Sequence, residues 1–567
     1  MTRALPLAAV GLGAFVIGAV IGREANDLGA AERFAAAWER QDFPAMYREI
    51  SPQAARRHPL AQFTADYEKA QRAATLERVS TGDASETDSG AGTAASVPVT
   101  IDTNAFGTLS GDLVLPLSGG RIAWSPDLVF PGLRAGERLV RRTRVAQRAP
   151  ILARDGTPLA EGPAIARSSP LGAAATNVAG EVSSPTPRQN KELVQLGFAP
   201  GAPTGTSGLE LAFNERLAGR PGGELVAVGP GVGTTGGRII ASSKPVPGKP
   251  VHTTIDPDLQ REAVVALGSQ FGGVAVLDAR SGSVLALAGI AFSGPQPPGS
   301  TFKVITTTAA LEAGVVKLSD QFPITTSATV GGREIANAHN EACGGSFVEA
   351  FAESCNAVFA PLGPKIGSQR LVATAERFGF NHPLSLFDAR ALQAVDPPES
   401  TIPKSIPSDL DLAVSAIGQG KVLATPLEMA EVAQTIANGG VRSPNRLVTD
   451  RALTGTAGPT RATSSEVAST LRRLMIGVVT NGTGTAAALP GIQVAGKTGT
   501  AELGPAPTTQ SQKASANQRV DAWFTGFAPA AKPKLVAAAM VVNASGDGGT
   551  VAAPIVHQVL AAGLGVG

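Results

Sequence analysis

The segment "PPGSTFKVI", residues 297–305, decides how the rest of the chain is interpreted. Two prolines and a glycine interrupt regular structure there, and Lys303 follows Ser300 by three positions. If a helix begins at or near Ser300, the two side chains lie on one helix face. A serine hydroxyl becomes a nucleophile when a base takes its proton, and a lysine whose pKa is lowered by burial is such a base. The alternative is a serine that caps a helix, next to an exposed lysine.

Two later segments favour the catalytic interpretation. The first is "SCN", which contains Ser354, Cys355 and Asn356, and the second is "KTGT", residues 497–500, which follows the apolar "IQVAG". In this order and at this wide spacing, S-x-x-K, S-x-N and K-T-G match one known set of active-site motifs. Each motif alone is common, but the three together are specific.

With these motifs the chain resembles the penicillin-binding proteins, the serine D,D-transpeptidases that cross-link peptidoglycan. Further segments resemble the monofunctional, class B members of the family. They are "RAPILARDG" (148–156), "SGLELAFNERLAGRPG" (207–222), "TIDPDLQ" (254–260), "IGQGKVLATPLEMA" (417–430) and "GTGTAA" (482–487). The front of the chain resembles, more loosely, the NTF2-like domain found in some Gram-positive members.

The resemblance implies a multidomain α+β architecture. Residues 4–22 are expected to be a transmembrane anchor, 26–130 an NTF2-like α+β domain, and 135–250 a strand-rich pedestal domain of the dimerisation type. Residues 251–567 are expected to form the penicillin-binding transpeptidase domain, an antiparallel sheet flanked by helices.

The resemblance also assigns roles to the motif residues. Ser300 would attack the carbonyl of the penultimate D-alanine of a stem peptide, and Lys303 would take its proton. Ser354 would relay a proton to the leaving D-alanine, with electrostatic support from Lys497. The expected substrate-binding residues are Asn356, Thr498, Gly499 and Thr500. The N–H groups of Ser300 and Thr500 would form an oxyanion hole, and β-lactams would acylate the same serine.

The first charged residues are Arg3 and Arg23, and the nineteen residues between Arg3 and Arg23 carry no charge. At about 1.5 Å per residue, such a helix matches the hydrocarbon core of a bilayer. A cleaved signal peptide is the alternative. No small-x-small cleavage site stands out before "REANDLG" (23–29), and no cysteine lies there to carry a lipid. We therefore expect a single-pass plasma-membrane protein whose catalytic domain is extracytoplasmic, and leave cleavage open.

Composition excludes several other classes of protein. Lys plus Arg is 48 and Asp plus Glu is 46, and aromatic residues make up 4%, so nucleic-acid binding is not expected. The five histidines are scattered and no H-E-x-x-H occurs, so neither a metal site nor another cofactor is expected. The two cysteines, Cys343 and Cys355, are compatible either with a disulfide or with two small buried residues.

Hydrophobic patterns predict the main local elements. "GVGTTG" (231–236) imitates a dinucleotide-binding fingerprint, but a strand pattern follows it, which indicates a hairpin turn. Two helices are predicted in 26–50, a helix over 59–75, a strand hairpin over 272–289, strands within 519–530 and 534–544, and a closing helix over 553–564.

Rival functions share these motifs. A D,D-carboxypeptidase, in which water resolves the acyl-enzyme, has the same three. A non-enzymatic β-lactam sensor or cell-wall scaffold is the second alternative, although no motif residue is lost. A β-lactamase is disfavoured because no motif offers a glutamate to activate water. Expected partners are peptidoglycan stem peptides, β-lactams, the membrane, and a separate glycan polymerase within a cell-wall synthesis complex. A role at the septum, side wall or in sporulation stays open, as does β-lactam affinity.

Overall fold

The structure is a computed structural model. It describes residues 28–88, 93–233, 235–384, 386, 398–451, 453–454, 457–502 and 519–566. The predicted anchor, residues 4–22, lies outside these residues. Within them, no helix is both long and apolar enough to cross a membrane.

The chain forms two compact units, which are described separately. One comprises Met1–Ala149, Ser183–Thr204 and Glu215–Lys249, and the other comprises Pro150–Val182, Gly205–Asn214 and Pro250–Gly567. The segment predicted as a pedestal therefore contributes to both units, and the domain boundaries drawn from the sequence stay a prediction.

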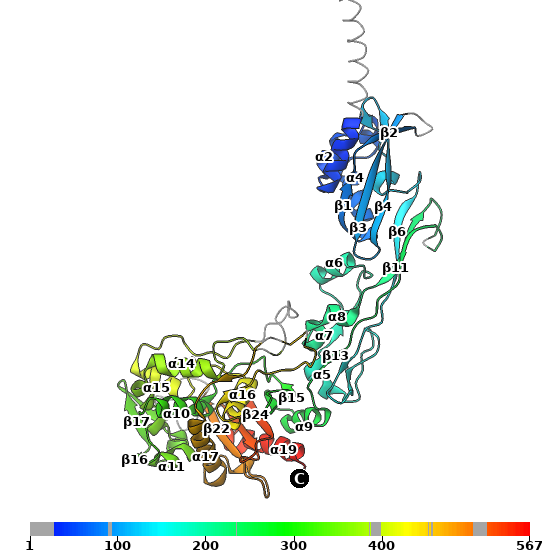
Figure 1. Cartoon of the computed structure of the whole chain (residues 1–567). Helices are drawn as coiled ribbons and strands as arrows, with labels where there is room; N and C mark the ends of the chain where they lie inside the picture. Colours follow the sequence, from blue (N-terminus) through cyan, green and yellow to red (C-terminus); the bar gives the residue numbers. More distant parts are fainter. Residues whose placement is uncertain are drawn as a thin grey trace, which may run out of the picture. The chain divides into compact units, whose positions relative to one another are not determined.

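The first unit begins with helices packed on an antiparallel sheet (Figure 1). The helices are a segment over residues 28–39, α2 (Phe43–Arg48), α3 (Pro52–Arg57) and α4 (Leu60–Ala74). The strands are β1 (Leu76–Thr81), β2 (Ser85–Asp88), β3 (Thr93–Thr103), β4 (Gly107–Ser118) and β5 (Arg121–Ile122), in the order β1-β3-β4-β5 with β2 on β3. The helices predicted for 26–50 and 59–75 are confirmed, because the aromatic side chains at their apolar positions form the core: Phe34, Trp38, Phe63 and Tyr67.

A second antiparallel sheet in this unit has the order β12-β11-β6. Its strands are β6 (Arg138–Arg144), β11 (Gly222–Val228) and β12 (Arg238–Ser243), and the helices nearby in sequence are α6 (Pro187–Gln195) and α8 (Asn214–Ala218). The pairing of β11 with β12 confirms that "GVGTTG" joins a hairpin and does not open a helix.

The second unit is built on a five-stranded antiparallel sheet with the order β15-β14-β24-β23-β22. These strands are β14 (Gly272–Asp278), β15 (Val284–Gly289), β22 (Ala495–Glu502), β23 (Val520–Ala528) and β24 (Leu535–Ala544). The hairpin predicted over 272–289 and the two later strands are confirmed. Because β22 is an edge strand, the K-T-G-T motif lies at the border of the sheet.

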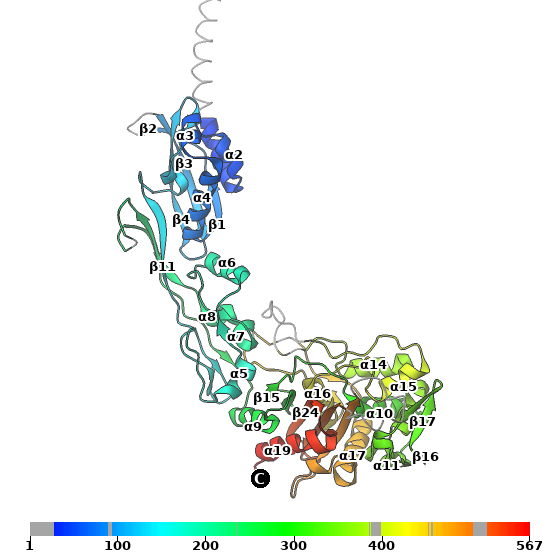
Figure 2. The same cartoon turned by 180° about the vertical axis from the view of Figure 1, so that it is seen from behind.

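Helices cover both faces of this sheet. On one face, α9 (Pro257–Leu267) and the closing helix α19 (Ala553–Leu564) share a core with alternate strand residues. Figures 1 and 2 both show these two helices side by side, although they stand at opposite ends of the domain sequence. On the other face lies α16 (Pro426–Ala437), since the Thr525 hydroxyl of β23 donates a hydrogen bond to its Met429 carbonyl at 2.7 Å.

Between α9 and α16 in sequence lie the helices and short hairpins that carry most of the motifs. The helices are α10 (Lys303–Glu312), α11 (Phe347–Ala352), α12 (Asn356–Phe359), α13 (Leu362–Ile366), α14 (Ser368–Phe378) and α15 (Asp409–Ala416), and α17 (Ser465–Asn481) follows later. The short strands are β16 (Gln321–Thr325), β17 (Ser327–Val330), β18 (Arg333–Ala336) and β19 (Cys343–Ser346), followed by β20 (Val441–Arg442) and β21 (Thr460–Arg461). The segments before α9 that belong to this unit hold β7 (Ile151–Leu152), β8 (Pro158–Ala160), α5 (Ala173–Ala179), α7 (Gly208–Ala212) and β13 (Val251–His252).

Candidate active site

Ser300 lies in a 3₁₀ turn, Gly299–Phe302, that leads directly into α10. The α-helix therefore begins at Lys303, slightly later than the start at or near Ser300 that the sequence suggested. Gly299 has φ +53°, a conformation that favours glycine, and its N–H donates to the Gly418 carbonyl at 2.9 Å. A Cβ atom at Gly299 would lie 2.7 Å from the Thr500 carbonyl oxygen. The turn is therefore wedged between the Gly418 loop and β22, which leaves Ser300 half-buried.

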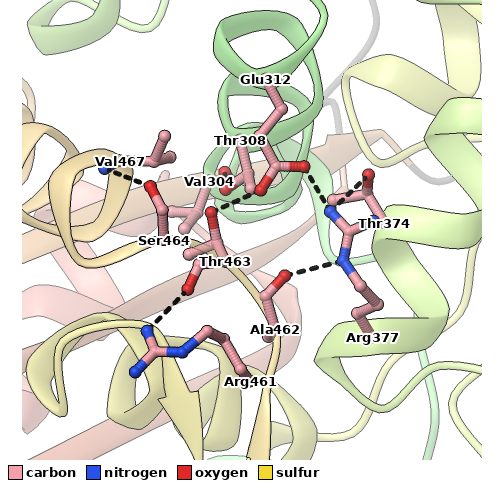
Figure 3. Close-up of polar contacts among 10 residues, drawn as sticks. All are labelled: Val304, Thr308, Glu312, Thr374, Arg377, Arg461, Ala462, Thr463, Ser464 and Val467. Carbon is pink, nitrogen blue, oxygen red and sulfur yellow. Dashed lines mark hydrogen bonds and ion pairs between the residues drawn. The ribbon is translucent and has the colours of Figure 1, made fainter.

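The helix that carries Lys303 is fixed at its far end by a polar network (Figure 3). The Thr463 hydroxyl donates to Glu312 Oε1 at 2.6 Å, and the Arg377 guanidinium pairs with Glu312 Oε2. Arg377 Nε also donates to the Ala462 carbonyl at 2.7 Å. These contacts tie the last turn of α10 to α14 and to the segment before α17, and thereby fix the position of Lys303 along the helix axis.

The S-x-N residues surround the Lys303 amine. Lys303 is fully buried, and its Nζ lies 2.8 Å from the Ser354 carbonyl oxygen and 2.8 Å from Asn356 Oδ1. The Ser354 hydroxyl is 3.4 Å away. Asn356 is held in turn, because its Nδ2 donates to the Ala336 carbonyl at the end of β18 at 2.9 Å.

Lys497 approaches the same hydroxyl from the edge strand β22. Its Nζ lies 2.8 Å from Ser354 Oγ and 3.2 Å from the Thr498 carbonyl oxygen, and the residue is fully buried. Gly499 permits this strand to pack against the Ser300 turn, since a Cβ there would stand 2.6 Å from the Pro298 carbonyl oxygen. The glycine serves this close approach to the turn, which is a more specific reason than strand geometry in general.

Burial controls the charge of both amines. It lowers the pKa of Lys303 well below its ordinary value, and the nearby Lys497 lowers the Lys303 pKa further. Burial also lowers the pKa of Lys497, to about 7. Among the described residues no carboxylate pairs with either amine. Besides the hydrogen bonds given above, the Phe359 ring lies 5.2 Å from Lys303 Nζ and the Phe351 ring 5.7 Å from Lys497 Nζ, and such rings offset the cost of a buried cation only modestly.

A count of donors shows what a neutral Lys303 amine can do. A neutral amine has two N–H donors and one lone pair. The Ser354 carbonyl and the Asn356 side chain accept the two N–H groups, which leaves the lone pair free to accept a proton from a hydroxyl. The Ser354 hydroxyl can accept from Lys497 and donate towards Lys303, so the two amines are linked through one serine.

The hydroxyl groups of Thr498 and Thr500 make their hydrogen bonds to residues outside this group. The Thr498 hydroxyl is 2.6 Å from that of Thr483, and the Thr500 hydroxyl accepts from the Gly548 N–H at 3.4 Å. Over the described part of the chain, the Ser300 hydroxyl makes no side-chain hydrogen bond. The structure thus joins Lys303, Ser354, Asn356 and Lys497 by direct hydrogen bonds, and brings the Ser300 turn against β22 through backbone packing.

Sequence reasoning missed two supporting residues. Thr483 belongs to "GTGTAA", a segment whose resemblance to the family was the available signal. Asn337 had no signal in the sequence. Its buried side chain accepts from the Ala357 N–H at 2.8 Å, next to Asn356, and donates to the Thr325 carbonyl at 2.8 Å.

The two cysteines, whose pairing the sequence left open, form a disulfide with Cα atoms 5.8 Å apart. Cys355 stands between Ser354 and Asn356, so the covalent bond lies within the S-x-N motif. The carboxylate of Glu353 is close to both sulfur atoms, but sulfurs bonded to one another offer no thiolate to a metal ion.

Three family models match the chain. Residues 272–561 match the penicillin binding protein transpeptidase domain, which is just over half of the 567 residues. Residues 162–253 match the penicillin-binding protein dimerisation domain, and residues 26–137 match the NTF2-like N-terminal transpeptidase domain.

Individual relatives agree with these models. The peptidoglycan D,D-transpeptidase PbpA of Mycolicibacterium smegmatis is 38% identical over 298 residues, which cover 48% of this chain and 56% of that protein. The chain thus spans little more than half the length of the curated relatives it matches. The penicillin G acyl-enzyme complex of penicillin-binding protein A from M. tuberculosis is 29% identical with a TM-score of 0.57, covering 74% of this chain and 100% of that one. The D,D-transpeptidase domain of a peptidoglycan glycosyltransferase from Eggerthella lenta also has a TM-score of 0.57 and 29% identity, covering 74% and 98%.

Proposed function

Because the chain belongs to the penicillin-binding protein transpeptidase family, we propose that it cross-links peptidoglycan stem peptides through an acyl-enzyme on Ser300 and that β-lactams acylate the same residue. The observation that carries this proposal is the Ser354 hydroxyl between two buried amines, at 3.4 Å from Lys303 Nζ and 2.8 Å from Lys497 Nζ. A lysine with only a structural role usually leaves its charged amine exposed to water. Lys303 and Lys497 are instead fully buried, without a carboxylate partner among the described residues.

Acylation follows from the proton arrangement. The neutral Lys303 amine takes the proton of the Ser300 hydroxyl as its oxygen attacks the carbonyl carbon of the penultimate D-alanine. The C–N bond to the terminal D-alanine then breaks, and the proton passes through the Ser354 hydroxyl to the leaving amine. Lys497 remains protonated and stabilises the negative charge, both on the relay and on the substrate carboxylate. In a β-lactam the ring C–N bond breaks instead, and the amine stays attached to the acyl group.

The other predicted binding residues lie around this centre. Asn356 holds the Lys303 amine, and in the proposal it also contacts the substrate amide. Thr498, Gly499 and Thr500 form the wall along β22, with the N–H groups of Ser300 and Thr500 as the oxyanion hole. The close approach of Gly299 to Thr500 supports this, because it brings the two backbone segments into contact.

The fate of the acyl-enzyme distinguishes the two enzymatic candidates. An amine from a neighbouring stem peptide gives a cross-link, whereas water gives carboxypeptidase activity. The matches to a dimerisation domain and an NTF2-like domain support transpeptidation, as do relatives named D,D-transpeptidases.

The proposal places the catalytic unit outside the cytoplasm. The Cys343–Cys355 disulfide supports this, because such bonds persist in oxidising compartments. The anchor at residues 4–22 would tether the protein to the plasma membrane in a single pass. A separate glycan polymerase in a cell-wall synthesis complex would supply the strands to be joined.

Mass spectrometry of the intact protein after exposure to penicillin G tests the proposal. We expect one adduct of the mass of the drug, mapped to the peptide that contains Ser300, and no adduct in Ser300→Ala. A synthetic stem peptide, incubated with and without an amine acceptor, then shows whether cross-linked or hydrolysed product forms. An adduct that persists in Ser300→Ala would contradict the assignment of the nucleophile.

A further inference from the structure

A disulfide lies beside two residues of the proposed site, yet the mechanism above uses neither sulfur atom. Cys355 separates Ser354 from Asn356 and is fully buried, and its partner Cys343 is 7% exposed. Both neighbours of Cys355 contact the Lys303 amine. Any shift at Cys355 is therefore transmitted to both groups that orient the proposed base.

Ser354 occupies a backbone position that helices usually give to glycine. At the end of α11 its N–H donates to the Phe351 carbonyl at 3.2 Å, and the Cys355 N–H donates to the Ala350 carbonyl at 2.9 Å. This pair of bonds defines a Schellman motif, in which the residue at the place of Ser354 adopts a left-handed conformation. Ser354 does so, with φ +61°. Serine pays a steric penalty there that glycine avoids, so the surroundings must impose the conformation.

The residue after the left-handed position normally packs back against the helix by an apolar contact. Here that residue is the fully buried Cys355, and a covalent bond to Cys343 holds it in addition. Its partner Cys343 begins β19, which runs straight into the N-cap of α11, where Ser346 and Glu349 form a capping box. The disulfide therefore closes a ring that contains β19, all of α11 and Ser354, and fixes the point at which the chain leaves the helix.

We propose that the Cys343–Cys355 disulfide is a positioning element of the active site, which holds Ser354 in its left-handed conformation. In that conformation the Ser354 hydroxyl lies 2.8 Å from Lys497 Nζ and its carbonyl oxygen lies 2.8 Å from Lys303 Nζ. Without the bond, the turn relaxes and both oxygens move away from the amines. This inference rests on the proposed function and deepens it, since it makes acylation depend on the redox state of a pair outside the reacting groups.

The test compares acylation of the full chain in three forms: oxidised, reduced with a phosphine, and Cys343→Ala. Reduction gives the disulfide two electrons and two protons, and the phosphine takes oxygen from water to become its oxide. Stopped-flow measurement with a fluorescent penicillin separates the limiting acylation rate from the affinity of the initial complex. Free thiols are counted by alkylation and mass spectrometry, and near-ultraviolet circular dichroism reports tertiary structure at the assay temperature.

We expect the limiting acylation rate to fall at least tenfold in the reduced protein and in Cys343→Ala, since a misplacement of about 1 Å at a catalytic group costs up to about a hundredfold. The affinity of the initial complex should change less than threefold. Phosphine should not change the acylation rate of Cys343→Ala, which has no disulfide to reduce. Reoxidation of the reduced wild-type protein should restore the rate of the oxidised form.

Two outcomes would overturn the inference. One is a limiting rate within twofold of the oxidised protein in both altered forms. The other is loss of the tertiary signal in both, which would make the bond a support of the whole fold. Failure of the proposed function looks different, because the oxidised wild-type protein would then carry no label on Ser300.

Discussion

Among the described residues of the second unit, two lysines and two glutamates form buried pairs of the same ionisable group, and the surroundings of the two pairs differ. Lys303 and Lys497 are both fully buried and meet at the Ser354 hydroxyl. Glu428 and Glu431 lie on α16, also almost fully buried. Burial acts on both pairs in the same sense, because it disfavours the charged form of each group.

The acidic pair has a counter-ion. Arg442 Nε donates to Glu431 Oε1 at 2.5 Å, and Asn445 Nδ2 donates to Glu431 Oε2 at 2.9 Å. Burial raises the pKa of Glu431, and Arg442 opposes that rise. Glu428 has an Oε1 atom without a hydrogen-bond partner among the described residues, and burial followed by the charge of Glu431 raises its pKa well above the usual range.

The lysine pair has hydroxyl, amide and carbonyl oxygens in place of a counter-ion. A buried charge that is paired with its opposite serves structure, whereas a buried amine without an opposite charge loses its proton more readily. Of the two lysines, Lys303 becomes the base, because burial and the nearby Lys497 both lower its pKa. A perturbed pKa is therefore not by itself a sign of catalysis. The partner set decides whether the perturbed group is free to accept a proton.

Replacing Lys303 should have the largest effect on acylation. We expect Lys303→Ala to lower the second-order rate constant for acylation by a fluorescent penicillin about a thousandfold, because general-base catalysis contributes about 10²–10⁴. Lys303→Arg should be as inactive, since a guanidinium stays protonated. Glu428→Gln is the matched control at the other pair, and its rate should stay within about threefold of wild type. A comparable loss in Glu428→Gln would contradict the distinction between the pairs.

Removing the counter-ion of the acidic pair should affect stability and leave the chemistry intact. Arg442→Met leaves Glu431 buried without its cation, and we expect a loss of about 3 kcal/mol at pH 7. Loss of penicillin labelling in rising urea reports unfolding of this unit. The destabilisation should shrink at pH 5: carboxyls whose pKa is raised by folding stabilise the protein below their unfolded pKa, and this stabilisation is lost as pH rises. An equal loss at both pH values would show that the carboxylates are not its cause.

The smallest expected effect is a pH dependence that separates the role of Lys303 from that of Lys497. Acylation requires a neutral Lys303, so its rate should rise as pH passes the lowered Lys303 pKa, and it should fall as Lys497, with a pKa of about 7, loses its proton. The fall approaches tenfold per pH unit for one proton. Lys497→Arg keeps its charge, and we expect the alkaline fall to disappear while the acid limb remains. A fall that persists in Lys497→Arg would assign that limb to another group.

The first helices and the family of the protein could both be predicted from the sequence. The apolar positions at Phe34 and Trp38 predicted the first helices, and both side chains are buried in the core. The spacing of the three motifs predicted the family, which the model covering residues 272–561 confirms. These features are local patterns, and periodicity or motif order is enough to recognise them.

Three features could be read from the sequence alone: the residue types available for chemistry, their order along the chain and most of the elements that carry them. Long-range folding was needed for the cysteines to pair, for Ser354 to turn left-handed, for Thr498 to meet Thr483, and for the two amines to be buried with no opposite charge beside them among the described residues. The physical reason is distance: Ser354 is 51 positions from Lys303 and 143 from Lys497, yet its hydroxyl meets both. A pKa depends on burial and on atoms a few ångströms away, and those neighbours exist only once the chain has folded.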